Sequence, residues 1–310
     1  MKQEGLTMKS EISALNLVTL DFIYSGIHRL PGLGEEVATG HLTLSLGGGP
    51  IASLITASRL GAKVRLATCL GQDRFSMIAR DFLEQESIPY RSFPASLAEG
   101  QSPVNVTSVM SIPGVDRSFV SYFPTTDFYS APSPELVRYI GDSAYCIASS
   151  PNAALFHALQ ESGCRVIYDV GWSDDLCIER LKDVLSAVYL FAPNEKEALK
   201  LTGAEDVRSA LLEMAAYVRH PIVKLGKRGA LFLQEDEIVH AEPVAFDTVD
   251  STGAGDAFLG GVTFGLLQGW DLRRCVELGN YTGGKATTGI GCLTSKASIA
   301  EFEELCRKSK

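Results

Sequence analysis

Seven residues near the C-terminal end, "DSTGAGD" at 250–256, place two acids around small and hydroxyl residues, directly before an apolar run. Ser251, Thr252 and Gly253 suit the start of a helix, where exposed N–H groups and the helix dipole form an anion site. Asp256 could accept a proton from a hydroxyl that attacks a phosphoryl group held there. It could equally be an acid that only stabilises the first helical turn. The stretch alone leaves both interpretations open.

An amide and an acid occur together in "APNEKEALKLTG" (192–203). Asn194 and Glu197 are three positions apart at a predicted helix start, so both side chains can point the same way. Such a pair can order the waters that Mg²⁺ keeps when it binds phosphates. An ordinary N-cap with a first-turn acid explains the same residues, and this motif alone favours the cap.

Two further stretches are rich in glycine. In "VKLGKRGALFL" (223–233), Gly226 and Gly229 could let a nucleotide approach the backbone, although a plain hairpin turn explains them and is preferred on the motif alone. In "LGGGPIASLITASRLGA" (46–62), a glycine triplet leads into an amphipathic helix. The triplet could be a hinge or a wall against a ligand, or only a flexible connection.

Strands and helices are predicted to alternate through most of the chain. Strands are expected at 63–71, 142–150, 164–171, 187–194, 220–226 and 230–234, with helices at 74–87, 152–163 and 195–203. This alternation indicates a mainly parallel sheet covered by helices on both faces. From about residue 253 the chain is expected to be helical, with a break at "TTGIGC".

Two regions depart from this alternation. Residues 15–30 and 36–49 have strand patterns with no helix between them, and 103–124 has two β-rich arms around a Pro-Gly turn. These pieces predict a small antiparallel sheet beside the main one. Such a sheet could act as a lid that excludes water from a reacting site.

Composition excludes several classes of protein. The 310 residues suffice for one large α/β domain with an addition, or for two domains. A net charge of −9 without a basic run argues against nucleic acid or anionic membrane as a partner. Seven scattered cysteines without a CxxC pair argue against a disulfide framework or structural zinc. No secretory signal and no apolar run near ~20 residues are present, so we expect a cytoplasmic protein.

The four motifs, in this order, resemble the ribokinase-like (PfkB) carbohydrate kinase family over roughly residues 14–306. "DSTGAGDAFLGGVT" is similar to the C-terminal signature of that family, and "GGGPIASLITASRLG" to its N-terminal signature. The resemblance implies a ribokinase-like three-layer α/β/α fold with a mainly parallel central sheet and a small antiparallel β lid. It implies one kinase domain over 1–310, with a discontinuous lid formed by about 20–46 and 103–124.

The resemblance also implies an ATP-dependent kinase that phosphorylates a hydroxyl of a sugar or modified sugar. Asp256 would be the catalytic base. The N–H groups that would form the anion hole belong to Gly253, Ala254 and Gly255. The cofactor-binding residues would be Asn194 and Glu197, which order Mg²⁺ through water, and Lys224, Gly226, Gly229 and Asn280, which lie along ATP. A monovalent cation such as K⁺ would lie at Asp250, Thr252, Gly291 and Ser295.

For the substrate, the matching positions are Asp21, Gly47, Gly48 and Ala52. Asp21 would bind substrate hydroxyls, and Gly47 and Gly48 would form the pocket wall. Ala52 departs from the family, because many of its sugar kinases have Asn there, and "GGGPxA" resembles members that act on modified sugars such as sulfofructose. The family lids often pair, so a homodimer through the lid is expected.

Alternatives remain at this point. A nucleoside kinase of the same family is the nearest rival. A 1-phosphofructokinase or tagatose-6-phosphate kinase would need Arg or Lys near the sugar; Arg29 and Arg117 are the lid-region candidates, but surface charge explains both. A non-catalytic sugar- or nucleotide-binding protein would be favoured by loss of Asp256, which is present. No GxGxxG follows the first strand, which excludes a dinucleotide-dependent dehydrogenase.

Overall fold

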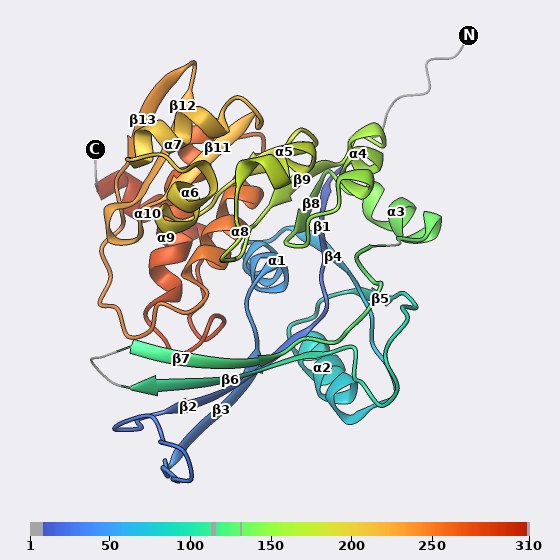
Figure 1. Ribbon diagram of the computed structural model, residues 1–310. Coiled ribbons are helices and arrows are strands. Elements are labelled where there is room, and N and C mark those ends of the chain that lie inside the picture. Colours follow the sequence, from blue (N-terminus) through green and yellow to red (C-terminus); the bar gives the residue numbers. More distant parts are fainter. Residues whose placement is uncertain (1–8, 113–115, 131, 309–310) are drawn as a thin grey trace.

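The computed structural model describes residues 9–112, 116–130 and 132–308. Within this part of the chain, nine strands form a sheet in the order β13-β12-β11-β10-β9-β8-β1-β4-β5 (Figure 1). These strands are β1 (Glu11–Leu15), β4 (Lys63–Thr68), β5 (Tyr90–Ser92), β8 (Tyr145–Ala148), β9 (Arg165–Tyr168), β10 (Val188–Phe191), β11 (His220–Lys224), β12 (Ala230–Gln234) and β13 (Glu237–Ala241). The β11–β12 and β12–β13 pairs are antiparallel and the other pairs of this sheet are parallel, which confirms the predicted mainly parallel sheet.

Helices cover both faces of this sheet (Figure 1). The helices are α1 (Pro50–Arg59), α2 (Arg74–Gln85), α3 (Pro134–Gly141), α4 (Ala153–Glu161), α5 (Ile178–Leu185), α6 (Glu195–Thr202), α7 (Val207–Met214), α8 (Ala254–Leu267), α9 (Leu272–Ala286) and α10 (Ile299–Lys308), with a 3₁₀ turn at Gly226–Arg228. Side chains alternate along β1, so that Ile12 and Ala14 pack with α1, α8 and α9, whereas Leu15 belongs to the opposite core of α3–α7. Among the described helices, none is long and apolar enough to cross a membrane.

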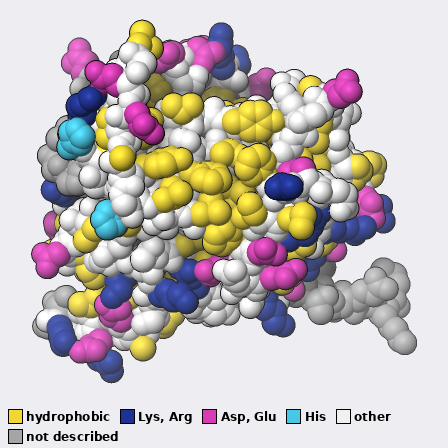
Figure 2. All heavy atoms as spheres, turned by 90° about the horizontal axis from the view of Figure 1, so that it is seen from below, with side chains coloured by type: hydrophobic (Ala, Val, Ile, Leu, Met, Phe, Trp, Pro, Cys, Tyr) yellow, Lys and Arg dark blue, Asp and Glu magenta, His cyan; other side chains and the backbone are white. Residues whose placement is uncertain are grey.

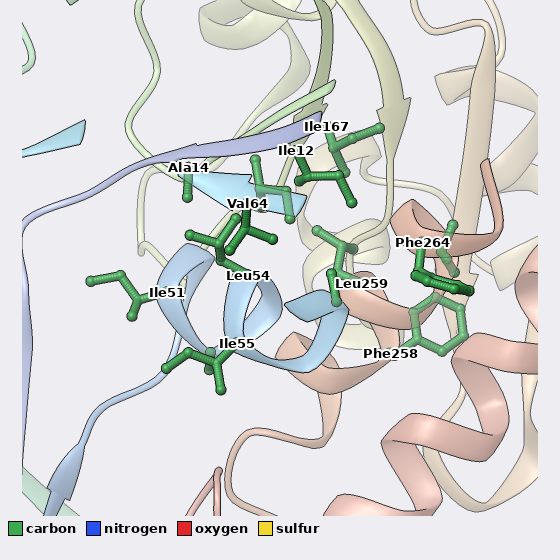
Figure 3. Packing of buried hydrophobic residues seen from close by; sticks show 14 of the residues in the cluster. Ile12, Ala14, Ile51, Leu54, Ile55, Val64, Ile167, Phe258, Leu259 and Phe264 are labelled. Atoms are coloured by element: carbon green, nitrogen blue, oxygen red, sulfur yellow. The ribbon is translucent and has the colours of Figure 1, made fainter. Parts of the chain in front are cut away.

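The packing of α8 against α1 fixes the position of "DSTGAGD". A Cβ on Gly260 would lie 2.4 Å from the carbonyl oxygen of Ser53, so only glycine lets these helix backbones approach so closely. Leu259 and Phe258 extend into the same buried cluster as Leu54 of α1 (Figure 3). Each fully buried side chain of this kind contributes about 1.5–3 kcal/mol. The first turn of α8 is therefore held firmly beside the first turn of α1.

A smaller sheet has the strand order β3-β2-β6-β7 and lies beside the main layers (Figure 1). Its strands are β2 (Thr19–Ser25), β3 (His41–Leu46), β6 (Asn105–Ile112) and β7 (Asp116–Tyr122). We call this sheet the lid. Asp21 pairs with Thr107, and Ser111 pairs with Arg117. Because alternate residues share a face, Asp21 and Arg117 project from the same face of the lid.

Candidate active site

Asp256 lies in the first turn of α8, after Gly253, whose φ of +73° suits glycine. A Cβ on Gly48 would lie 2.4 Å from Asp256 Oδ2, so the carboxylate rests directly against the backbone of Gly48. The hydroxyl of Ser53 donates to the main-chain carbonyl of Asp256 at 2.8 Å. The structure thus brings together two motifs that are about 200 residues apart in the sequence.

The surroundings of Asp256 change its acidity. Burial raises its pKa, as does the nearby charge of Asp169, and the Gly49 amide and the Lys224 ammonium only partly counteract this, so the pKa rises to about 7. A carboxyl group that only stabilises a helix start is favoured in its charged form, with a low pKa. A pKa near neutrality instead suits a group that takes up a proton during a reaction.

Asp21 is the second acid here, and its side chain is buried. A Cβ on Gly47 would lie 2.7 Å from Asp21 Oδ1, so Gly47 and Gly48 each hold one carboxylate against the backbone. Burial raises the pKa of Asp21 to about 6. Gly47 and Gly48 are therefore packed closely against two carboxylates rather than forming a loose connection, and they bring Asp21 towards Asp256.

Ala52 lies in the hydrophobic core, with 1% of its surface exposed. Its carbonyl accepts a hydrogen bond from Thr56 Oγ1 at 2.9 Å within α1. Because residue 52 is enclosed by the hydrophobic core, a small apolar side chain fits there. The substrate contact expected at residue 52 remains a prediction.

A cavity of about 580 Å³ opens beside the first turn of α8. Six residues expected to bind ATP or to form the anion hole line it, namely Lys224, Gly226, Gly229, Ala254, Gly255 and Asn280. Val244 and Phe246, from the segment between β13 and α8, line it together with Gly283 and Thr287 of the α9 region. Sequence reasoning missed all four residues, and the segment that carries Val244 and Phe246 contains no recognisable motif.

Two of the expected ATP contacts also shape the cavity wall. Asn280 Nδ2 donates to the carbonyl oxygens of Ala241 and Glu242 at 3.0 and 2.8 Å, which ties α9 to the end of β13. Gly229 has φ +77°, and a Cβ there would meet the Ala241 oxygen at 2.1 Å. The hairpin-turn interpretation of Gly229 therefore holds, and the same turn borders the cavity.

Lys224 lies between the cavity and the acids around Asp256. Its Nζ lies 3.4 Å from Asp169 Oδ1, and a Cβ on Gly255 would lie 3.1 Å from the same Nζ. Burial alone would lower the pKa of Lys224, but Asp169, Glu197 and Asp256 more than offset this, and the pKa is raised. Lys224 therefore carries a positive charge next to the proposed phosphate site. Asp169, in the "DVGW" stretch, was not predicted as a site residue.

Asn194 and Glu197 form a capping box at the start of α6. Asn194 Oδ1 accepts a hydrogen bond from the main-chain N–H of Glu197 at 3.0 Å. Glu197 Oε2 accepts one from the main-chain N–H of Asn194 at 2.8 Å. The cap interpretation is thus correct. Glu197 is nevertheless buried, and burial, with the charge of Asp169, raises the pKa of its carboxyl. A role in ordering Mg²⁺ through water remains a prediction.

The loop before α8 contacts the lid. Asp250 accepts hydrogen bonds from the Gly291 and Thr252 amides, at 2.8 and 2.9 Å. Arg117 of β7 donates to Asp250 Oδ1 at 2.8 Å and to Thr252 Oγ1 at 2.7 Å. Of the expected cation ligands, Asp250, Thr252 and Gly291 therefore lie together. Ser295 instead forms a hydrogen bond with Thr288 Oγ1 at 2.8 Å.

The two arginines of the lid region differ in their surroundings. Arg29 forms an ion pair with Glu35 on the surface, and both side chains are about half exposed, at 48% and 50%. Arg117 forms its ion pair with Asp250 where the side chains are only 26% and 17% exposed. Surface charge therefore explains Arg29 but not Arg117.

Comparison with known proteins decides the family. A family model described as "pfkB family carbohydrate kinase" matches residues 15–299. The chain belongs to the PfkB family. As a PfkB carbohydrate kinase, it is a phosphotransferase with an alcohol group as acceptor, and the resemblance found in its sequence is confirmed.

Named relatives include PfkB-type kinases of sugars and nucleosides. The chain is 27% identical to a cytidine kinase of Thermococcus kodakarensis, covering 76% of this chain and 86% of that protein. It is 26% identical to a deoxyribokinase of Salmonella typhimurium, covering 89% and 92%. The Arabidopsis thaliana ribokinase solved with ribose and ATP superposes with a TM-score of 0.79, at 19% identity, over 96% of this chain and 99% of that one. This likeness confirms the ribokinase-like fold.

Proposed function

We propose that this PfkB kinase transfers the γ-phosphoryl group of ATP to a hydroxyl of a sugar or nucleoside, with Asp256 as the base. The observation that carries the proposal is the placement of Asp256. Its carboxylate contacts the Gly48 wall on the Asp21 side and lies close enough to Lys224, which lines the cavity with Gly255, for the two charges to interact. An acceptor hydroxyl and a phosphate can therefore meet at this carboxylate.

In the proposed reaction, Asp21 orients the acceptor and Asp256 takes the hydroxyl proton. The hydroxyl oxygen bonds to the γ-phosphorus while the bond to the β,γ-bridging oxygen breaks, and ADP leaves with that electron pair. We assign to the N–H groups of Gly253, Ala254 and Gly255 the stabilisation of the negative charge on the oxygens of the transferred phosphoryl group. Lys224 adds a positive charge at the same position.

Magnesium fits this arrangement through oxygen donors. Glu197 is an acid close enough to Lys224 and Asp169 for their charges to affect its pKa, and Asn194 adds an amide oxygen to the same helix start. Mg²⁺ keeps several waters when it binds phosphates, so Glu197 and Asn194 would hold it through water. The ion would supply charge neutralisation to the phosphates.

The proposal covers both sugars and nucleosides as acceptors, because relatives of both kinds match this chain. An ADP-release screen over sugars, sugar acids, sulfosugars and nucleosides tests the proposal. We expect one class to stimulate ADP release far above the rate without acceptor. No stimulation by any of them would contradict the proposed function.

Because such a kinase consumes ATP, we place it in the cytoplasm.

The pH dependence of kcat/KM reports the free enzyme and tests the base directly. Asp256 must be deprotonated to accept the proton, and its pKa is raised to about 7. We therefore expect kcat/KM to fall about tenfold per pH unit below that value and to level off above it. A profile that stays flat from pH 8 down to about 5 would contradict the assignment.

We also propose that two chains pair through the lid. On the lid face opposite Asp21, Leu42 and Val120 are 58% and 65% exposed, and apolar side chains gather on the surface seen from this side (Figure 2). Light scattering should show a dimer that Leu42→Asp with Val120→Asp converts to a monomer. Leu212→Asp on α7, which is similarly exposed at 53%, is the control. A monomeric wild type would refute the pairing.

A further inference from the structure

Arg117 reaches from the lid to the loop that precedes α8. Its Nη1 donates to Asp250 Oδ1 at 2.8 Å, to Thr252 Oγ1 at 2.7 Å and to Ser251 Oγ at 3.3 Å. Thr252 in turn donates through its amide and its hydroxyl to the same Asp250 oxygen. A guanidinium group therefore lies on side-chain oxygens of Asp250 and Thr252, two of the four residues that were expected to hold a monovalent cation.

These contacts do not fit a bound K⁺. A K⁺ ion replaces its hydration shell with several oxygen atoms. Asp250 Oδ1 and Thr252 Oγ1 are instead occupied by N–H donors of Arg117, and Asp250 Oδ2 accepts from the Gly291 amide. A second cation at the same oxygens would also be repelled by the positive charge of the guanidinium.

We propose that Arg117 takes the place of the monovalent cation, so that this kinase supplies its own counter-ion to Asp250 and needs no K⁺. The proposal rests on the proposed phosphoryl transfer at Asp256. Asp250 lies just before Gly253, Ala254 and Gly255, whose N–H groups are assigned to the transferring phosphate. An unbalanced carboxylate behind that loop would oppose a phosphate in front of it. Arg117 is thus a positioning residue that acts through the loop.

Because the counter-ion Arg117 belongs to the lid, it links the acceptor site with the phosphate site. Arg117 and Asp21 project from the same face of one four-stranded sheet. Asp21 is assigned to the acceptor, and Arg117 contacts the loop assigned to the phosphate. A lid position that places Asp21 on the acceptor therefore also neutralises Asp250. A diffusing K⁺ ion would provide no such link between acceptor and phosphate sites.

The test compares turnover in KCl, NaCl and choline chloride at equal ionic strength. We expect wild-type rates that agree within about twofold. Arg117→Ala should lose about tenfold or more in kcat, with a smaller change in the KM of the acceptor, because the loop acts on charge that develops in the transition state. K⁺ or low-millimolar guanidinium should restore part of that kcat. Arg117→Lys should keep more activity than Arg117→Ala, and Arg29→Ala is the control.

Several results would overturn the proposal. They are a wild type strongly activated by K⁺, an Arg117→Ala variant as fast as wild type in choline chloride, or a folded Arg117→Ala variant that neither K⁺ nor guanidinium rescues. If Arg117→Ala does not fold, the turnover of wild type in KCl, NaCl and choline chloride still decides whether the kinase needs K⁺.

A binding readout separates this proposal from the proposed function. Thermal unfolding in KCl and in choline chloride should give the same midpoint for wild type, whereas KCl should raise the midpoint of Arg117→Ala alone. This difference needs no turnover. A wild type inactive with every acceptor would refute the kinase assignment, and the unfolding midpoints would still test Arg117. Stabilisation of wild type by K⁺ would overturn the replacement.

Discussion

Asp256→Asn is expected to bind ATP and acceptor almost as the wild type does, yet to turn over about 10²–10⁴-fold more slowly. The amide has the size of the carboxyl group that rests against Gly48, so the site keeps its shape. It cannot take the proton from the attacking hydroxyl. Calorimetric titration measures binding, and steady-state ADP release with the acceptor found in the screen measures kcat.

The control for Asp256→Asn is Asp183→Asn, the same change at an exposed position of α5. That variant should match the wild type in both binding and turnover. Near-normal turnover by Asp256→Asn would reject Asp256 as the base. It would leave the helix-start interpretation of this acid as the better one.

Gly48→Ala should be the second most damaging substitution. Its Cβ would lie 2.4 Å from Asp256 Oδ2, and the nearest obstacle is the end of a side chain, so the fold can survive while the carboxylate moves. A displacement of about 1 Å can cost on the order of 10²-fold in rate. We therefore expect a large fall in kcat with little change in the unfolding midpoint, measured by kinetics and thermal denaturation.

Gly40→Ala provides the matched comparison, because a Cβ there would meet nothing within 4 Å. It should leave both kcat and the unfolding midpoint unchanged. If Gly48→Ala turned over like wild type, the close contact between Gly48 and Asp256 would have no part in catalysis. If its midpoint collapsed, the wall would support the fold rather than the carboxylate.

Local sequence patterns predicted most of the fold. Short apolar, strand-like runs predicted β4, β8 to β12 and the lid strands, and Gly163 and Gly203 marked the ends of α4 and α6, because those signals lie within one element. The first strand was missed. β1 covers Glu11–Leu15, before almost all of the predicted run 15–30, and that run contains β2 (Thr19–Ser25) of the lid. Only pairing with β4 and β8 determines which part joins the main sheet.

The site was predictable where motifs were continuous and unpredictable where contacts span the chain. Asp256 and its glycines lie in one stretch, whereas the contact of Gly48 with Asp256 depends on how α1 packs on α8. Arg117 meets Asp250 only because the lid folds over the loop, 133 residues away in sequence. Phe246 lines the cavity from a segment without regular structure, where no periodicity marks which side chains point inward.

Transfer of labelled phosphate from [γ-³²P]ATP tests the central claim most directly. ADP release alone does not distinguish transfer to an alcohol from transfer to water. With wild-type enzyme and the acceptor from the screen, the label should appear on a hydroxyl oxygen of that acceptor, and Asp256→Asn should reduce its formation to the extent that it reduces kcat. Label found only in inorganic phosphate, or transfer that persists in Asp256→Asn, would contradict the account.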